Sequence, residues 1–159
     1  MTSESPSSRS ILIVLSTKRY NPSVLEKSIK EADEIRASGR MPVLTVLYIR
    51  EPDHLRRADD TLRTKGFLGT AARERVMDAL EGEQLTMAAE LCESTCEMIR
   101  EAGHEVSSIE TTGDYAKAVV EYAEMQRYDV IYVVRASRYP WSAMLHDSEE
   151  EVMVRYART

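Results

Sequence analysis

No apolar run in this sequence approaches the length of a transmembrane helix. The stretch that follows Met1, TSESPSSRS, is polar and lacks the apolar core of a signal peptide. We therefore expect residues 1–9 to be a disordered lead-in. We also expect the protein to be cytoplasmic and to have no membrane partner.

Positive charge is also in short supply. The chain has 21 Lys and Arg residues against 27 Asp and Glu residues, and its formal net charge is −6. Because polyanions favour basic surfaces, this balance argues against general nucleic-acid binding. Apolar residues make up 43% of the 159 residues and charged residues 30%, an ordinary globular mixture. This length suits a single domain over residues 10–159.

Cysteine is limited to Cys92 and Cys96, which lie four residues apart in a strongly helical stretch. Helical spacing defines the apolar stripe Leu85, Ala89, Cys92, Cys96 and Ile99. This stripe predicts that both thiols face the core. A metal or redox role would need further ligands that the sequence does not reveal.

Catalytic and metal-binding patterns are absent as well. The three histidines, His54, His104 and His146, form no spacing such as HExxH. His146 precedes Asp147, but adjacent residues seldom converge on one substrate, and a surface histidine is the preferred interpretation. No series of nucleophile, base and acid stands out. We predict no catalytic residues, no metal ligands and no enzymatic activity.

The first half of the chain indicates a strand, a helix and a second strand. Continuous apolar runs at 11–15 and 42–49 are typical of strands that are buried on both faces of a parallel sheet. Between them, Asn21 followed by Pro22 predicts a helix start, and Gly39 predicts the helix end. This order is that of a βαβ unit.

Residues 51–82 indicate a surface insertion. The stretch 51–70 is charged, mixed in character and interrupted by glycines, and we expect an irregular excursion there. A short helix is predicted over 71–80 with Thr70 as its cap. The apolar pair Phe67-Leu68 is either a docking tip or, as we prefer, a local anchor. A longer helix is predicted over 83–102.

The C-terminal half continues the alternation of strands and helices. Residues 104–109 alternate weakly, which favours an edge strand. Asp114 is the expected cap of the next helix, and a buried strand is predicted over 130–134. Four strands alternating with helices predict an open α/β sheet.

The order of elements over roughly 10–158 resembles the universal stress protein family. The closest match is GDYAKAVVEYAEMQRYD at 113–129, which is similar to that family's GDPAEAILEYAEE-like helix. Tyr115 stands where the family usually has proline, at a helical position that accepts most residues. DVIYVVRAS at 129–137 is similar to DLIVMGSRG with its two glycines changed. The resemblance implies a Rossmann-like, open and mostly parallel sheet with flanking helices.

The resemblance also implies that this chain lacks the glycines of the family's ATP-binding loop. In the family's ATP-binding members, the last strand is followed by Gly, two residues, Gly, nine residues, and then Gly-Ser or Gly-Thr. Those positions here hold Val134, Ser137, Asp147 and Ser148. A phosphate cradle needs close backbone approach and often positive φ, which a β-branched residue resists, and Asp147 would repel phosphate. The resemblance thus implies a degenerate ATP site and no resident cofactor.

By the same resemblance, Ser16 replaces an aspartate that contacts adenosine, Val14 replaces a proline beside the base, and Ile49 is the base-facing backbone position. The full set of residues implied to line the nucleotide site is Val14, Ser16, Ile49, Val133, Val134, Arg135, Ser137 and Ser148.

An adenine-nucleotide module with a modified phosphate grip is the alternative. Arg135 and Arg138 are either phosphate-binding guanidinium groups or solvated loop charges, and such a grip would suit AMP better than ATP. Tyr139 and Trp141 flank Pro140, which stiffens the loop. These aromatic residues would stack on a base, mark a partner interface or fill the vacant site.

The tail is ambiguous between helix and strand. Ser148 and Glu151 form a capping box that favours a helix, whereas the apolar residues that follow alternate as in a strand, and we favour the helix. Universal stress proteins usually have a fifth strand after that helix, and this sequence stops before supplying one. An open edge at strand 130–134 predicts a homodimer, or a strand from a protein partner. We expect a non-enzymatic regulatory or stress-response protein.

Overall fold

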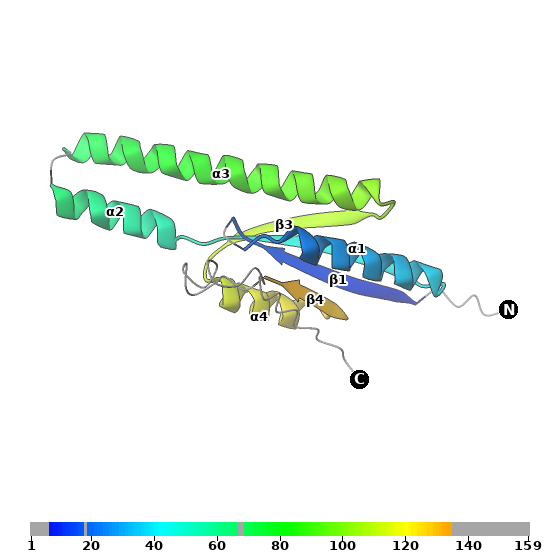
Figure 1. The fold of residues 1–159 in the computed structure, drawn as a ribbon. Coiled ribbons are helices and arrows are strands. Elements are labelled where there is room, and N and C mark those ends of the chain that lie inside the picture. Colours follow the sequence, from blue (N-terminus) through cyan, green and yellow to red (C-terminus); the bar gives the residue numbers. More distant parts are fainter. Residues whose placement is uncertain (1–6, 18, 67–68, 135–159) are drawn as a thin grey trace, which may run out of the picture.

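The computed structural model describes residues 7–17, 19–66 and 69–134. They form a four-stranded sheet of order β3-β2-β1-β4, and every pair of neighbouring strands is parallel. The predicted open α/β architecture is therefore confirmed (Figure 1). The elements in chain order are β1 (Ser8–Leu15), α1 (Pro22–Ala37), β2 (Met41–Arg50), α2 (Asp53–Lys65), α3 (Thr70–Glu101), β3 (Val106–Thr112), α4 (Tyr115–Met125) and β4 (Val130–Val133).

Two apolar clusters cover the two faces of the sheet. One unites β1, β2 and β4 with α1 and α3, and Ile13, Val46 and Ile99 in it are fully buried. The other joins the opposite face of β1 and β2 to α4. Figure 1 shows the same layering, with α1 and α3 on one side of the sheet and α4 on the other. Burial on both faces explains why β1 and β2 are nearly continuous apolar runs.

Helix α1 begins and ends where the sequence predicts. The side-chain oxygen of Asn21 accepts a hydrogen bond of 3.0 Å from the backbone N–H of Ser23, and Pro22 is the first helical residue. Past the helix end, Gly39 adopts φ of 81°, a left-handed conformation that favours glycine. The order β1, α1, β2 is thus the predicted βαβ unit.

The prediction of an irregular stretch over 51–70 is wrong for most of its length, because residues 53–65 form helix α2. Salt bridges of Asp59 stabilise this helix and its neighbour. One, of 3.0 Å, joins Asp59 to Arg63 one turn later, and another, of 3.5 Å, joins it to Arg73 of α3. The apolar signal of α2 is weak because the helix packs against α3 and not against the sheet.

Residues 71–80 and nearly all of 83–102 are helical as predicted, but the predicted break between them is wrong, because both belong to α3, one helix of 32 residues. Gly82 lies in its interior, where its cost of about 1 kcal/mol is offset by the strong helix formers around it. Gly69 is the N-cap and Thr70 is the first helical residue, so Thr70 is not the cap.

The N-terminal half of α3 extends past the sheet beside α2 (Figure 1). Leu85 is 42% exposed and Ala89 is also exposed, contrary to the predicted core stripe, because α3 turns Ala88, which is 1% exposed, towards the core in their place. The C-terminal part of the stripe is confirmed, since Cys96 and Ile99 are buried and Cys92 is partly buried.

Several strand boundaries differ from the predicted ones. Strand β1 begins at Ser8, inside the expected lead-in 1–9, and β4 ends at Val133, one residue before the predicted end. The edge strand β3 starts at Val106, two residues later than predicted. Its start is displaced because His104 is buried and bonded to α1: its Nε2 lies 2.7 Å from Oδ1 of Asp33.

Several predictions concern residues outside the described part of the chain. They are the anchor Phe67-Leu68, the loop residues Arg135, Ser137, Arg138, Tyr139, Pro140, Trp141, His146, Asp147 and Ser148, and the tail with its proposed helix. None of the described helices combines the length and apolar character needed to cross a membrane.

Candidate functional site

The four strands end at the same edge of the sheet because all of them are parallel. From β1 the chain passes through β2 to β3 on one side, and then returns by α4 to place β4 on the other side of β1. The crevice between the carboxyl ends of β1 and β4 is therefore the point where the strand order reverses. Open α/β sheets bind their ligands at such a point.

The predicted site residues that the structure describes do gather at this edge. Val14 and Ile49 are fully buried near the ends of β1 and β2, and Ser16, directly after β1, is 2% exposed. Val133 and Val134 are half-buried at the end of β4. The other three predicted residues, Arg135, Ser137 and Ser148, lie outside the described residues.

Tyr115 occupies the crevice between β1 and β4. It is the first residue of α4 and is only 5% exposed. Its hydroxyl donates a 3.2 Å hydrogen bond to the carbonyl oxygen of Val14 and accepts a 3.4 Å hydrogen bond from the backbone N–H of Val134. One side chain thus joins the ends of the two strands between which a ligand would enter.

The sequence interpretation of Tyr115 as a harmless replacement for proline missed this role. Proline at the first position of a helix would leave the crevice open, because its ring is short and carries no polar atom. The signal available in the sequence was the size of the residue. A tyrosine directly after the Asp114 cap must place a large side chain with a hydroxyl at the carboxyl edge of the sheet.

A charged network covers the outer face of Tyr115. The guanidinium carbon of Arg19 lies 4.2 Å from the centre of the Tyr115 ring, which is a cation–π contact. The same guanidinium lies 3.4 Å from a carboxylate oxygen of Glu51, and Glu51 also accepts a 3.0 Å hydrogen bond from the hydroxyl of Ser16. Backbone hydrogen bonds between Ser16 and Arg19 hold the turn after β1 in place.

Burial raises the pKa of the Tyr115 hydroxyl to about 12, although the Val134 N–H and the nearby Arg19 charge act in the opposite direction. Desolvation dominates because the ring is enclosed by the core cluster under α4. The hydroxyl is consequently neutral at physiological pH. It acts as a structural hydrogen-bonding group and not as an acid or base.

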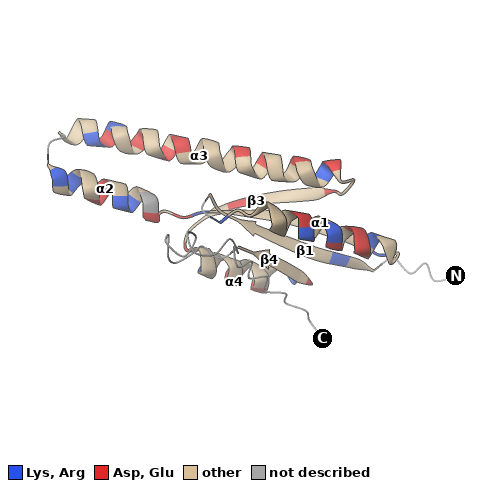
Figure 2. Cartoon of the chain, viewed as in Figure 1, with Lys and Arg blue, Asp and Glu red and all other residues tan. Residues whose placement is uncertain are grey.

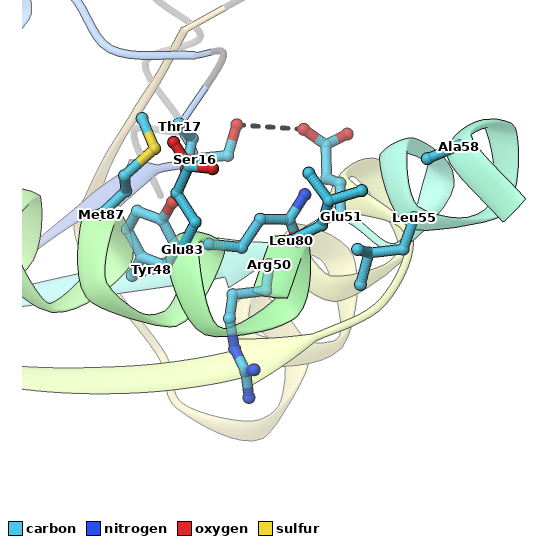
Figure 3. Close-up of a pocket in the computed structure, with 11 residues that line it drawn as sticks. Ser16, Thr17, Tyr48, Arg50, Glu51, Leu55, Ala58, Leu80, Glu83 and Met87 are labelled. Atoms are coloured by element: carbon cyan, nitrogen blue, oxygen red, sulfur yellow. Dashed lines mark hydrogen bonds between the residues drawn. The ribbon is translucent and has the colours of Figure 1, made fainter. Parts of the chain in front are cut away.

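A separate cleft of about 360 Å³ opens on the other side of this edge, between the sheet and the pair α2 and α3. Figure 3 shows the side chains around it. The cleft is lined by Ser16, Thr17, Tyr48, Arg50, Glu51, Leu55, Ala58, Leu80, Glu83, Gln84 and Met87. Sequence reasoning missed it because eight of these eleven residues lie after Tyr48. Most of them belong to α2 and α3, whose packing on each other the sequence does not predict.

The nucleophilic and basic groups of the described residues do not converge. The His104 side chain is fully buried, and its two ring nitrogens contact Asp33 and Arg36. Burial raises the pKa of both thiols, to about 11 for Cys96, so these cysteines are poor nucleophiles at neutral pH. No cluster of three metal-ligating side chains occurs within the described ranges.

Comparison with known proteins identifies the fold. The structure is similar to universal stress protein UspA from Lactobacillus plantarum, with a TM-score of 0.57 and 14% identity over 86% of this chain and 83% of that protein. It is also similar to the hypothetical protein MJ0577, with a TM-score of 0.55 and 13% identity over 79% of this chain and 73% of that one. No family model and no curated protein matches the chain. At these identities the likeness shows the fold alone, and it confirms the predicted universal stress protein fold.

We predict that Tyr115→Phe destabilises the protein by about 1–3 kcal/mol, because it leaves the buried Val14 carbonyl and Val134 N–H without their partner. Tyr122→Phe on the same helix should cost at most about 0.5 kcal/mol, since that hydroxyl makes no hydrogen bond to the described residues. Urea unfolding of both variants measures the difference. Equal stabilities of the two variants would contradict the bridging role.

The raised pKa of Tyr115 also predicts a pH effect on stability. The pKa of Tyr115 is raised in the folded state, so its contribution is complete below its unfolded pKa of about 10 and is lost as pH rises towards 12. The stability advantage of the natural protein over Tyr115→Phe should hold up to about pH 10 and shrink above it. An advantage that grows with pH over this interval would contradict the assignment.

Proposed function

We propose that this chain, which has the universal stress protein fold, is a non-enzymatic regulatory or stress-response protein with a degenerate ATP site. The observation that carries the proposal is the position of Tyr115 in the crevice at the carboxyl ends of β1 and β4. A crevice filled by the chain itself has no room for the nucleoside that such a sheet would otherwise bind.

Phosphate binding is disfavoured by the backbone as well as by volume. A phosphate loop presents free N–H groups to the anion, but the N–H of Val134, the first residue after β4, is already bonded to the Tyr115 hydroxyl. Val134 is also β-branched and therefore poorly suited to the left-handed conformations of such loops.

Absence of enzymatic activity is the second part of the proposal. At the carboxyl edge, Tyr115 is held neutral by burial and Glu51 is engaged with Ser16 and Arg19. A general base needs free hydrogen-bond reach to a substrate, and neither group offers it. The edge is arranged to hold the ends of the strands together.

The alternative function is binding of AMP or ATP through a modified grip. Arg19 favours it, because its guanidinium lies at the same edge and its side chain is 26% exposed, so it can reach an anion. Arg135, Ser137 and Ser148 would have to supply the remaining contacts. On this reading Tyr115 would serve as a platform for the base, with Arg19 moving from its ring to the phosphate.

Calorimetric titration with ATP and AMP, with and without Mg²⁺, distinguishes the two functions. We predict that neither nucleotide binds more tightly than about 1 mM, which corresponds to roughly −4 kcal/mol. Tyr115→Ala provides a matched test of the crevice, because it removes the filling side chain but leaves the loop unchanged. Micromolar binding to the natural protein would overturn the degenerate site and establish the alternative.

We further propose that the regulatory role is exercised as a homodimer through the edge of β4. Among the described residues, β4 pairs only with β1, so its outer edge has no partner there. Helix α4, which leads into β4, leaves Val120 54% exposed and Met125 74% exposed. An open strand edge and exposed apolar side chains on the helix that precedes it both favour association with a second chain.

Sedimentation velocity over a range of concentrations tests the dimer. We predict that Met125→Glu weakens self-association by about tenfold or more, because it places a charge in the interface core. Met98→Glu is the matched control, since Met98 is 40% exposed on α3 on the opposite face of the sheet. A monomer at all concentrations, or equal effects of the two substitutions, would contradict the proposal.

A further inference from the structure

The cleft under α2 and α3 is distinct from the crevice that Tyr115 fills. It lies on the face of the sheet that α1 and α3 cover, and Tyr48, whose side chain belongs to that core, contributes to its floor. The crevice belongs to the opposite core, with Val14 and Tyr115. The two sites share only the strand-end residues around Ser16 and Glu51. Filling one of them therefore leaves the other open.

The walls of the cleft are apolar. Leu55 and Ala58 come from α2, and Leu80 and Met87 come from α3. Met87 is 44% exposed and contributes apolar surface to the wall of the cleft. The volume of about 360 Å³ is at the lower end of the range of small-molecule sites, which fits a compact ligand with an apolar body.

The floor of the cleft is polar but neutral. The hydroxyls of Thr17 and Tyr48 are hydrogen-bonded to each other, and burial raises the pKa of Tyr48. Hydroxyls accept as well as donate hydrogen bonds, so this pair can accept a bond from a donor group on a ligand. Gln84 on α3 adds an amide to the lining.

The charge of the cleft selects the sign of its ligand. Glu51 is neutralised by Arg19, and the guanidinium of Arg50 points away from Ser16 and Glu51, with its Nε 2.8 Å from Glu110 on β3 (Figure 3). Glu83 remains, and it makes no ion pair or hydrogen bond with any described residue. The site thus presents one uncompensated carboxylate beside apolar walls.

Figure 2 places this carboxylate in its surroundings. Acidic side chains recur along α3, whereas basic ones cluster on α2 and at the end of α3 next to it. Anions are repelled by Glu83, and a divalent metal ion would need more oxygen ligands than one carboxylate and two hydroxyls supply. A monocation with an apolar body would match both the Glu83 carboxylate and the apolar walls of the cleft.

We propose that the cleft between the sheet and the pair α2 and α3 binds a small primary amine with an apolar body. The ammonium group pairs with Glu83 and donates to the hydroxyls of the floor, while the apolar body packs against Leu80 and Met87. This inference extends the proposed function, because it supplies a ligand for a protein whose nucleotide crevice is closed.

The test uses three probes that share a phenyl group on a short carbon chain and differ in charge. They are 2-phenylethylamine, a cation, 2-phenylethanol, which is neutral, and phenylacetate, an anion. Binding to the full chain is followed by two-dimensional amide NMR at neutral pH and low salt. We predict that the amine binds about fivefold more tightly than the alcohol, the upper range for an exposed ion pair, and that phenylacetate does not saturate. The shifted amides should be those of Thr17, Glu51, Glu83 and Met87.

Glu83→Gln should remove the preference for the amine over the alcohol. Glu90→Gln, an exposed carboxylate on the same helix that does not line the cleft, should preserve it. Met87→Arg should weaken binding of both probes, because it replaces part of the apolar wall with a long charged side chain, and its charge also repels the amine. Absence of saturable amine binding, a preference that survives in Glu83→Gln, or shifts confined to other residues would overturn the proposal.

The proposal and the proposed function fail in different experiments. Micromolar ATP binding would overturn the closed crevice and leave the amine result unaffected. Failure of the amine to bind, with no nucleotide binding, would overturn the ligand assignment of the cleft alone.

Discussion

The structure depends on how the ends of β1 and β4 are held together. These two strands meet where the strand order reverses, and a parallel sheet has an opening there because the helices that follow the strands leave in different directions. A sheet that binds a nucleotide uses this opening for its ligand. Here the hydroxyl of Tyr115 joins the Val14 carbonyl to the Val134 N–H, and Arg19 covers the ring.

The open cleft of this structure lies on the face of the sheet that α1 and α3 cover. Helix α2 and the N-terminal half of α3 extend beyond the sheet and pack on each other, with Asp59 bonded to Arg63 and Arg73. The space between them and the strand ends is the open cleft. The unpaired Glu83 carboxylate of the cleft repels anions, so we do not expect the cleft to take a phosphate ligand.

The sequence was sufficient to predict the elements with strong local signals. The runs at 11–15 and 42–49, the Asn21-Pro22 start and the Asp114 cap all specify structure over a few residues, and all were confirmed. Helix α2 was missed because it is stabilised by packing against α3, and the local sequence of α2 does not show that contact. The role of Tyr115 was missed because its side chain, at the start of α4, reaches residues that lie 19 and 101 positions away in the sequence, and no local rule specifies such a contact.

The most direct test of this account is the amide signal of Val134 and the ring signals of Tyr115, recorded by NMR with and without ATP at about 5 mM, a concentration that would populate even a millimolar site. The account predicts that neither signal moves and that the Val134 amide exchanges slowly with solvent, because its hydrogen bond to Tyr115 persists. Saturable shifts of both signals, with faster exchange at Val134, would show that ATP displaces the tyrosine. That result would contradict the central claim that the chain closes its own nucleotide crevice.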